Sequence, residues 1–204
     1  MAAAAVAGPR PATRLAGLAS RHWPLLLLLL VCAGLRALFF IGLLGSDDTA
    51  YALNAMAIRN GSFVLGEDMT SMRLALNVAA ATSYGLFGVS EWATALPTFV
   101  ASLLTLAIVY AIAWLIGGRM AAIVAGVLYA VAPLNILNSS SLLPEVPMAL
   151  CTTLSILIFL LGQRAVRAQT EVSLCLVSGV VLGGAYLFTS AAYPGGVGRV
   201  PDCC

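Results

Sequence analysis

The sequence contains no lysine, and charged residues of either sign are scarce. Asp, Glu, Lys and Arg make up 9% of its 204 residues, whereas soluble domains carry roughly 25%. So few charges cannot cover a soluble globule, and 61% of the residues are hydrophobic, so lipid is expected to be the main solvent. The arginines form no basic cluster with interleaved aromatic residues, and nucleic acid is therefore not expected as a partner.

The cysteines lack the spacing of a metal site. Cys32, Cys151 and Cys175 lie inside apolar runs, where cysteine behaves as a small hydrophobic residue. The terminal pair, Cys203 and Cys204, has no histidine or further cysteine at ligand spacing. We therefore expect no cysteine metal site, and a divalent cation bound elsewhere is the one cofactor left open.

Long apolar runs predict five membrane-spanning helices, at residues 23–45, 93–116, 121–137, 146–162 and 172–188. The first run is longer than the core of about 7–15 residues in a cleaved signal peptide, so we predict a retained signal anchor. The expected organisation is a disordered basic tail at residues 1–23, a transmembrane module at 24–188 and an irregular tail at 189–204. The fold class expected is an all-α, polytopic membrane protein.

The region between the first two runs, residues 45–92, decides the predicted topology. Its segment 73–90 is short and polar for a membrane span. If that segment lies flat on the membrane, the loop arginines share the cytoplasmic side with the N-terminal arginines, as the positive-inside rule requires. These loop arginines are Arg119, Arg164 and Arg167.

If the segment crossed the membrane instead, those arginines would lie outside, and the rule would be broken. We therefore predict a multi-pass protein of the plasma (inner) membrane with a cytoplasmic N-terminus. Its first outer loop would carry two amphipathic helices, at about Asp48–Arg59 and Met72–Phe87. Asp47 and Glu145 would then face the same, extracytoplasmic side.

Acidic residues at this outer surface can be explained in two ways. A carboxylate whose pKa is set by its neighbours can act as a general base toward a hydroxyl or amine, and Arg73 could hold a phosphate. However, Asp47 and Asp48 also suit the N-terminus of a helix, and an exposed acid such as Glu145 needs no special role. The residues by themselves leave both explanations open.

Arg36, inside the first apolar run, is predicted to extend its side chain to the outer membrane interface.

Four segments follow one another in a recognisable order. They are SDDTAYA (46–52), MRLALNVAAATSYGLFGVSEWATALPT (72–98), YAIAWLIGGRMAAIVAGVLYAVAP (110–133) and NSSSLLPEVPMAL (138–150). In this order they resemble motifs of the GT-C glycosyltransferases that use polyprenyl-phosphate sugars, namely the protein O-mannosyltransferases and the lipid A aminoarabinose transferases.

The resemblance implies a partial GT-C fold in which two juxtamembrane helices follow the first span. It implies that Asp47 is the catalytic base and that Asp48 and Tyr51 shape the site beside it. Glu145 would help to position the acceptor, and Arg73 would contact the lipid phosphate. The implied reaction transfers a sugar from a polyprenyl-phosphate donor to a lipid or protein acceptor outside the cytoplasm.

The sequence departs from the family pattern at several positions. The second acid is Glu145 where the family usually has Asp, Leu74 and Ala75 follow Arg73 where the family has two prolines, and Ala95 replaces an arginine. Family members are also much longer, so we expect an N-terminal portion that need not be active by itself.

A small polytopic transporter or assembly subunit without catalysis is the alternative. A transporter should place ionisable groups at mid-membrane, and Arg36 alone fits that description.

Overall fold

The computed structural model describes residues 11–43, 45, 47–66, 68–165 and 168–189. All regular elements in these residues are α-helices, which confirms the predicted all-α class. The helices are α1 (Pro11–Leu38), α2 (Asp47–Arg59), α3 (Met69–Met72), α4 (Leu74–Phe87), α5 (Glu91–Val131), α6 (Pro133–Ser139), α7 (Glu145–Gly162) and α8 (Ala168–Thr189).

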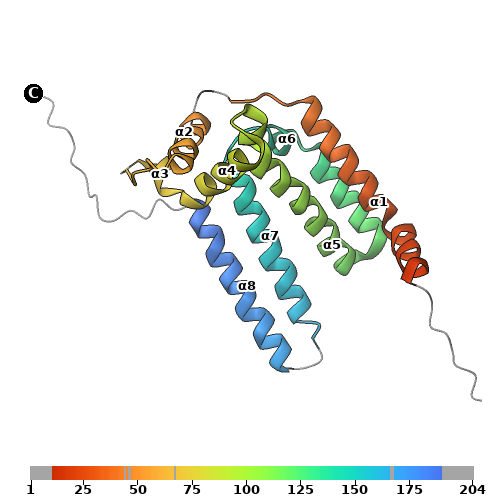
Figure 1. The fold of residues 1–204 in the computed structure, drawn as a ribbon. Helices are drawn as coiled ribbons and strands as arrows, with labels where there is room; N and C mark the ends of the chain where they lie inside the picture. The colour runs from red at the N-terminus through yellow and green to blue at the C-terminus, as the bar shows by residue number, and fades with distance from the viewer. Residues whose placement is uncertain (1–10, 44, 46, 67, 166–167, 190–204) are drawn as a thin grey trace, which may run out of the picture.

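Two helices of the described residues, α5 and α7, are long and apolar enough to cross a membrane. Helix α5 reverses its direction at Gly118, whose φ of 72° and ψ of −162° suit glycine alone. It is therefore a hairpin with two arms (Figure 1), which correspond to the predicted spans 93–116 and 121–137. The predicted total of five spans stays a prediction.

The second arm of the hairpin is shorter than predicted. It ends at Val131, and Pro133 begins the separate helix α6. Proline lacks a backbone N–H and disfavours helical backbone at the preceding residue, and Ala132 accordingly has a ψ of 116°. The predicted span 121–137 is therefore divided into an arm and a short helix.

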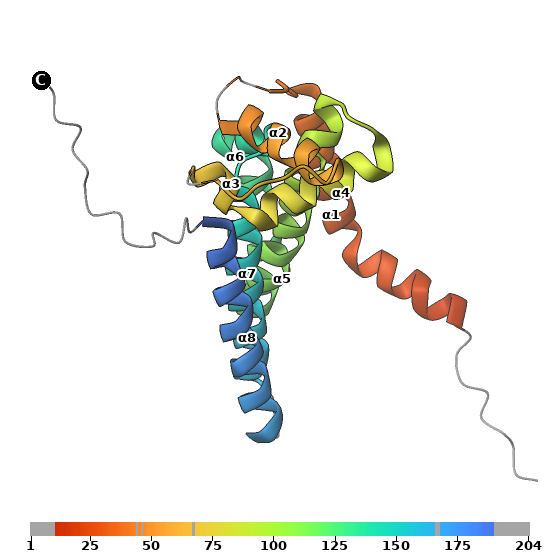
Figure 2. The same ribbon diagram turned by 60° about the vertical axis from the view of Figure 1, so that its left-hand side comes forward.

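Helices α2, α3 and α4 lie together across one end of the long helices (Figures 1 and 2). Helices α2 and α4 occupy the segments for which two amphipathic helices were predicted. From this end, α7 and α8 run away side by side, while α1 packs along the α5 hairpin. The arrangement separates a cap of short helices from a body of long apolar ones.

Hydrogen bonds from two side chains of α4 join this cap to the long helices. The Ser83 hydroxyl donates to the Ala93 carbonyl oxygen over 2.6 Å, and the Tyr84 and Thr94 hydroxyls lie 2.6 Å apart. Because Tyr84 is 1% exposed, its ring also packs into the core of the cap. These contacts hold α4 against the start of α5.

Arg36 does not reach the membrane interface, so the predicted position of its side chain is wrong. It shares one face of α1 with Leu28 and Cys32, and this face packs against the α5 hairpin. The residue is 0% exposed. Its Nε donates to Ser102 Oγ over 2.8 Å, and its Nη1 donates to Cys32 Sγ over 2.7 Å.

The N-terminal helix also begins earlier than the predicted span, at Pro11. Residues 1–10 and 190–204, for which terminal tails were predicted, lie outside the described residues.

The burial of Arg36 generates a prediction about stability. Ser102→Ala should lower the free energy of unfolding by about 1–3 kcal/mol, because it leaves a donor of a buried cation without its acceptor. Arg36→Met should be close to neutral, since it removes the buried charge and keeps the volume. Unfolding in guanidinium chloride and detergent micelles, followed by circular dichroism, measures both changes.

The control for this comparison is Thr82→Ala, because the Thr82 hydroxyl is exposed and bonds only within its own helix. It should change stability by less than about 0.5 kcal/mol. A larger loss of unfolding free energy in Arg36→Met than in Ser102→Ala would show that the buried guanidinium is a net stabilising group.

Candidate active site

Tyr51 lies at the centre of the candidate site. It is 0% exposed on α2 and belongs to a core cluster formed by α2, α4, the start of α5 and the loop before α7. Its phenolic oxygen accepts a hydrogen bond from Arg73 Nη1. The Arg73 Cζ atom lies 5.8 Å from the centroid of the Tyr51 ring. A buried phenol and a half-buried guanidinium thus form one polar pair between α2 and α4.

Two carboxylates act on this pair from different parts of the chain. Burial raises the pKa of Tyr51, the Arg73 guanidinium lowers it, and the charges of Asp47 and Glu145 raise it further. Both carboxylates therefore lie near the Tyr51 phenol, although they are far apart in the sequence. The structure brings together four of the five residues singled out from the sequence, and Asp48 is their immediate neighbour.

Asp47 lies in the first turn of α2 and shares a helix face with Tyr51, four residues later. The linker before it is anchored on the start of α5. The Phe40 and Trp92 rings stack with centroids 3.8 Å apart, and a Cβ atom at Gly42 would lie 2.5 Å from a Glu91 carboxylate oxygen. Gly42 also has a φ of 79°, so glycine is required there.

Asp47 and Asp48 have different surroundings. Asp47 is exposed, whereas Asp48 is 2% exposed. The Asp48 Oδ1 atom accepts the backbone N–H of Thr49 over 2.9 Å. This bond and its place in the first turn agree with a role for Asp48 at the helix N-terminus. Asp47 is the acid of the pair that a second molecule can reach.

Glu145 begins α7, directly after Pro144, and its side chain is exposed. The loop before it is tied to α5, because the buried Thr98 hydroxyl donates to the Ser141 carbonyl oxygen over 2.9 Å. Leu142 of the same loop is 0% exposed and packs in the cluster of Tyr51. The loop that leads into α7 therefore shares a core cluster with Tyr51 of α2.

Arg73 is held at the break between α3 and α4, where its ψ of 58° interrupts the helix. Helix α3 before it is capped by Asp68, whose Oδ2 accepts the Ser71 N–H over 3.0 Å. After it, Asn77 Nδ2 donates to the Thr70 carbonyl oxygen over 2.8 Å. These bonds fix the backbone on both sides of the guanidinium.

Sequence reasoning did not single out Asn54 or Asn77. Both carry a buried atom without a hydrogen-bond partner among the described residues, Nδ2 of Asn54 and Oδ1 of Asn77, as does Arg73 at Nε. Buried polar groups nearly always have partners, so these atoms are free to bind water or a ligand. Asn54 follows Tyr51 by three residues and Asn77 follows Arg73 by four, spacings that place two residues on one face of a helix. This spacing is the sequence signal that could have identified them.

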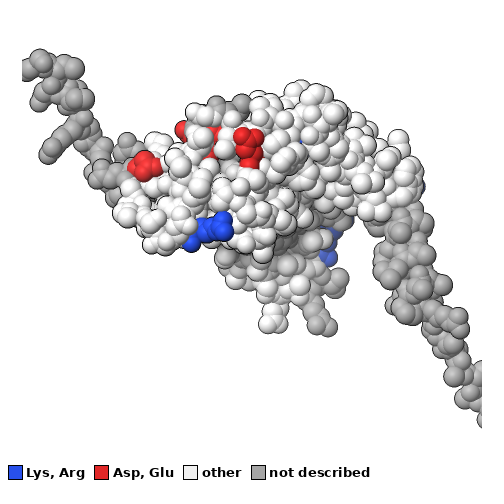
Figure 3. Space-filling model, turned by 45° about the horizontal axis from the view of Figure 1, so that its top comes forward, with Lys and Arg blue, Asp and Glu red and all other residues white. Residues whose placement is uncertain are grey.

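Acidic side chains gather on the face that carries the cap of α2, α3 and α4 (Figure 3). Within the described part of the chain, however, no three His, Cys, Asp or Glu side chains lie close enough to hold a metal ion together.

The apolar helices define the class of protein, which is a helical membrane protein. Its candidate site lies in the cap of short helices at one end. A family model described as dolichyl-phosphate-mannose-protein mannosyltransferase matches residues 74–194, more than half of the sequence. The chain belongs to this family, which confirms the resemblance to GT-C glycosyltransferases and identifies it as a membrane glycosyltransferase in general terms.

The matched range includes Glu145 and begins directly after Arg73, so Asp47, Asp48 and Tyr51 precede it. No curated protein matches the chain, and no solved structure does.

The pKa of Tyr51 tests whether the two carboxylates meet at the phenol. It should lie above the ordinary value of about 10. Asp47→Asn and Glu145→Gln should each lower it by removing a negative charge, whereas Arg73→Met should raise it. Titration of ¹³Cζ-labelled tyrosine by NMR, with Tyr51→Phe to assign the signal, measures each value.

Asp68→Asn is the matched control, because Asp68 caps α3 and does not act on the phenol. An unchanged Tyr51 pKa in Glu145→Gln would separate Glu145 from the site.

Proposed function

We propose that this membrane glycosyltransferase takes its sugar from a polyprenyl-phosphate donor and transfers it to a lipid or protein acceptor outside the cytoplasm. The observation that carries the proposal is the convergence of Asp47 and Glu145 on the Tyr51–Arg73 pair. The family match supports it, because a dolichyl-phosphate sugar is the donor in the family description.

In this proposal Asp47 is the general base. Its carboxylate is exposed at the start of α2, so an acceptor hydroxyl can approach it. Asp47 takes the proton of the hydroxyl while the acceptor oxygen forms a bond to the anomeric carbon of the sugar. The bond from that carbon to the phosphate oxygen breaks, the electron pair leaves with the phosphate, and the configuration inverts.

Arg73 stabilises the phosphate that leaves. A guanidinium binds phosphate oxygens through charge-assisted hydrogen bonds, and Arg73 has a buried Nε without a partner among the described residues. The hydrogen bond to Tyr51 holds the guanidinium in place before the donor arrives. Asp48, in the first turn of α2, helps to hold the helix that carries Tyr51.

Glu145 orients the acceptor. Its carboxylate is exposed on the first turn of α7, and its charge raises the pKa of Tyr51. A hydrogen bond from an acceptor group to Glu145 would direct the reacting hydroxyl toward Asp47. Such positioning lowers the entropic part of the barrier.

We further propose that the N-terminus is cytoplasmic in an inner (plasma) membrane. Arg164 bonds to the Leu115 carbonyl oxygen near the reversal of the α5 hairpin, and Arg119 lies in that reversal. The acids Asp47, Asp48 and Glu145 belong to the opposite end, with the cap. The cap also carries Arg59 and Arg73, so the positive-inside rule is supported here by Arg119 and Arg164 in the loops between the long helices.

One observation favours the non-catalytic alternative. Arg36 is a buried ionisable residue between helices, which is typical of a transport pathway. However, its Nε donates to Ser102 of α5, so it links α1 to α5, while its Nη1 donates to Cys32 of its own helix and its Nη2 has no partner among the described residues. The family match supports the enzyme.

The proposed roles of Asp47 and Arg73 predict two different kinetic defects. Asp47→Asn should lower kcat by about 100-fold or more and leave donor binding intact, because a general base acts on the chemical step. Arg73→Ala should weaken donor binding by about 10-fold or more through loss of a charge-assisted hydrogen bond. Both defects are measured by the transfer of labelled mannose from polyprenyl-phosphate-mannose in membranes that contain a full-length form of the protein.

Asp68→Asn should keep wild-type transfer, because this acid caps α3. Undiminished transfer in Asp47→Asn would remove Asp47 as the base. Absence of transfer by a full-length form of the protein with polyprenyl-phosphate sugars would contradict the proposed donor.

The proposed topology predicts the side from which introduced cysteines react. In a cysteine-free background, Asp47→Cys and Glu145→Cys should both react with an impermeant thiol reagent added outside intact cells. Arg119→Cys, at the hairpin reversal, should react only after the cells are opened. Labelling of positions 47 and 145 from opposite sides would rule out a shared site.

A further inference from the structure

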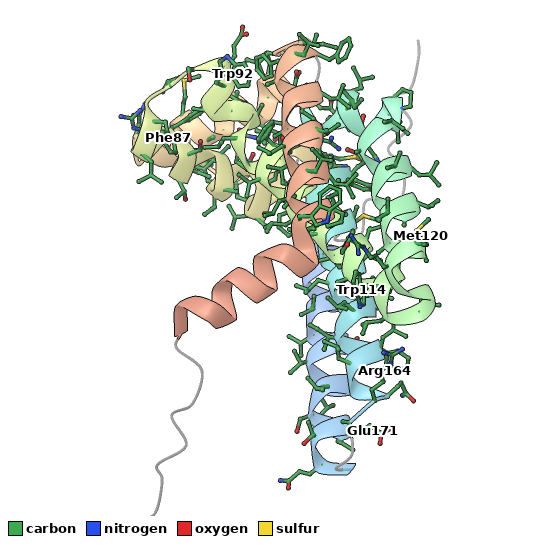
Figure 4. All side chains as sticks on the ribbon, turned by 90° about the vertical axis from the view of Figure 1, so that its right-hand side faces the viewer. Phe87, Trp92, Trp114, Met120, Arg164 and Glu171 are labelled. Carbon is green, nitrogen blue, oxygen red and sulfur yellow. The ribbon has the colours of Figure 1, made fainter. Side chains whose placement is uncertain are left out.

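Thr98 is buried in the first arm of the α5 hairpin, close to the cap. Figure 4 shows Trp92 at the end of α5 that carries the cap, and Arg164 and Glu171 at the opposite end of the molecule. Thr98 follows Trp92 by six residues, which is about 9 Å along a helix. Its side chain is 0% exposed, so its hydroxyl can act only on neighbouring parts of the chain.

The Thr98 hydroxyl joins α5 to the loop before α7. Its Oγ1 atom donates to the Ala95 carbonyl oxygen over 2.8 Å and to the Ser141 carbonyl oxygen over 2.9 Å. A threonine in a helix commonly bonds to a carbonyl of the preceding turn, so the first contact needs no special role. The second contact spans 43 residues of sequence and links two separate segments.

The loop receives this link at a carbonyl group that also shapes its turn. The backbone N–H of Leu143 donates to the same Ser141 oxygen over 3.1 Å. Leu142, between these two residues, is 0% exposed and packs in the core cluster of Tyr51. Adjacent residues of the loop are therefore held by two different parts of the protein, Ser141 by α5 and Leu142 by the core of the cap.

Little freedom remains between this link and Glu145. The residue before Glu145 is Pro144, whose ring fixes φ, here at −70°. The residue after it, Val146, is buried. Because the Glu145 side chain is exposed, packing of the carboxylate does not set its position, and the backbone of the loop does. A shift of the loop at Ser141 is therefore passed on to the carboxylate.

We propose that Thr98 is a positioning residue of the transferase, whose hydroxyl holds the loop before α7 so that the Glu145 carboxylate stays near the Tyr51 phenol and orients the acceptor. The inference rests on the proposed acceptor role of Glu145. The position of Glu145 can nevertheless be measured without any sugar transfer, because its charge raises the pKa of Tyr51.

Thr98→Val tests the positioning, because valine keeps the shape of the side chain and removes the donor. With the loop released, the Glu145 charge should move away from the phenol, and the pKa of Tyr51 should fall toward its value in Glu145→Gln. Thr98→Ser keeps the hydroxyl and should restore the wild-type value. The NMR titration of ¹³Cζ-labelled tyrosine measures each pKa.

Two comparisons separate positioning of Glu145 from a general loosening of the fold. The double variant Thr98→Val/Glu145→Gln should have the same Tyr51 pKa as Glu145→Gln alone, because Thr98 acts on the phenol through that charge. Thr105→Val is the matched control. Thr105 is 1% exposed on the same arm, and its hydroxyl bonds within its own helix, to the Ala101 carbonyl oxygen over 2.8 Å. This variant should keep the wild-type pKa.

The consequence for catalysis is a defect on the acceptor side. In membranes that contain a full-length form of the protein, Thr98→Val should lower the maximal transfer of labelled mannose to the acceptors of those membranes by about 10-fold, since a misplaced positioning group slows the reaction. The KM for polyprenyl-phosphate-mannose should not change, because Arg73 still contacts the phosphate. Thr98→Ser should restore transfer, and Thr105→Val should not reduce it.

A wild-type Tyr51 pKa in folded Thr98→Val would overturn the proposal, as would additive pKa shifts in the double variant or an unchanged pKa in Glu145→Gln. If Thr98→Val does not fold, judged by its circular dichroism, Thr98→Cys provides a weaker donor and should lower the pKa by a smaller amount; an unchanged pKa there would also overturn the proposal. If the full-length wild type transfers no sugar, the proposed reaction fails, whereas the Tyr51 pKa in Thr98→Val still decides whether Thr98 positions Glu145.

Discussion

The burial of Tyr51 is the constraint on which the candidate site depends. Its ring fills the core between α2, α4 and the loop before α7, so these segments can only pack if the phenolic group also finds a partner. Arg73 supplies that partner from the break between α3 and α4. The same packing places the first turns of α2 and α7 near one phenol. A single buried aromatic residue thus couples the folding of the cap to the position of Asp47 and Glu145.

The reversal at Gly118 decides which charged residues share an end of the molecule. The cap carries Arg59 and Arg73 as well as acids, and Glu171 lies at the other end (Figure 4). The hairpin returns the chain to the end at which it entered, so the acids that begin α5 and α7 and those that begin α2 lie at one end. Arg119 remains at the turn and Arg164 joins it there.

Local patterns predicted much of this fold. The all-α class, the helices of the first loop and the break between the runs 93–116 and 121–137 follow from residue periodicity, which acts over a few residues. The length of the second arm was predicted wrongly, because the apolar pattern continues through Pro133 while the backbone hydrogen bonds do not. The identities of Asp47, Glu145 and Arg73 as candidates came from family resemblance and topology.

The sequence by itself determined that the chain forms apolar helices, because a backbone in lipid must satisfy its hydrogen bonds within each segment. It also determined which residues carry charge. Only the tertiary structure decided where those charges meet. Arg36 became an internal link because its face of α1 packs on the hairpin, and Asp47 and Glu145 both act on the Tyr51 phenol, whose ring shares a core with Leu142. Such contacts join residues distant along the chain, and no local pattern encodes them.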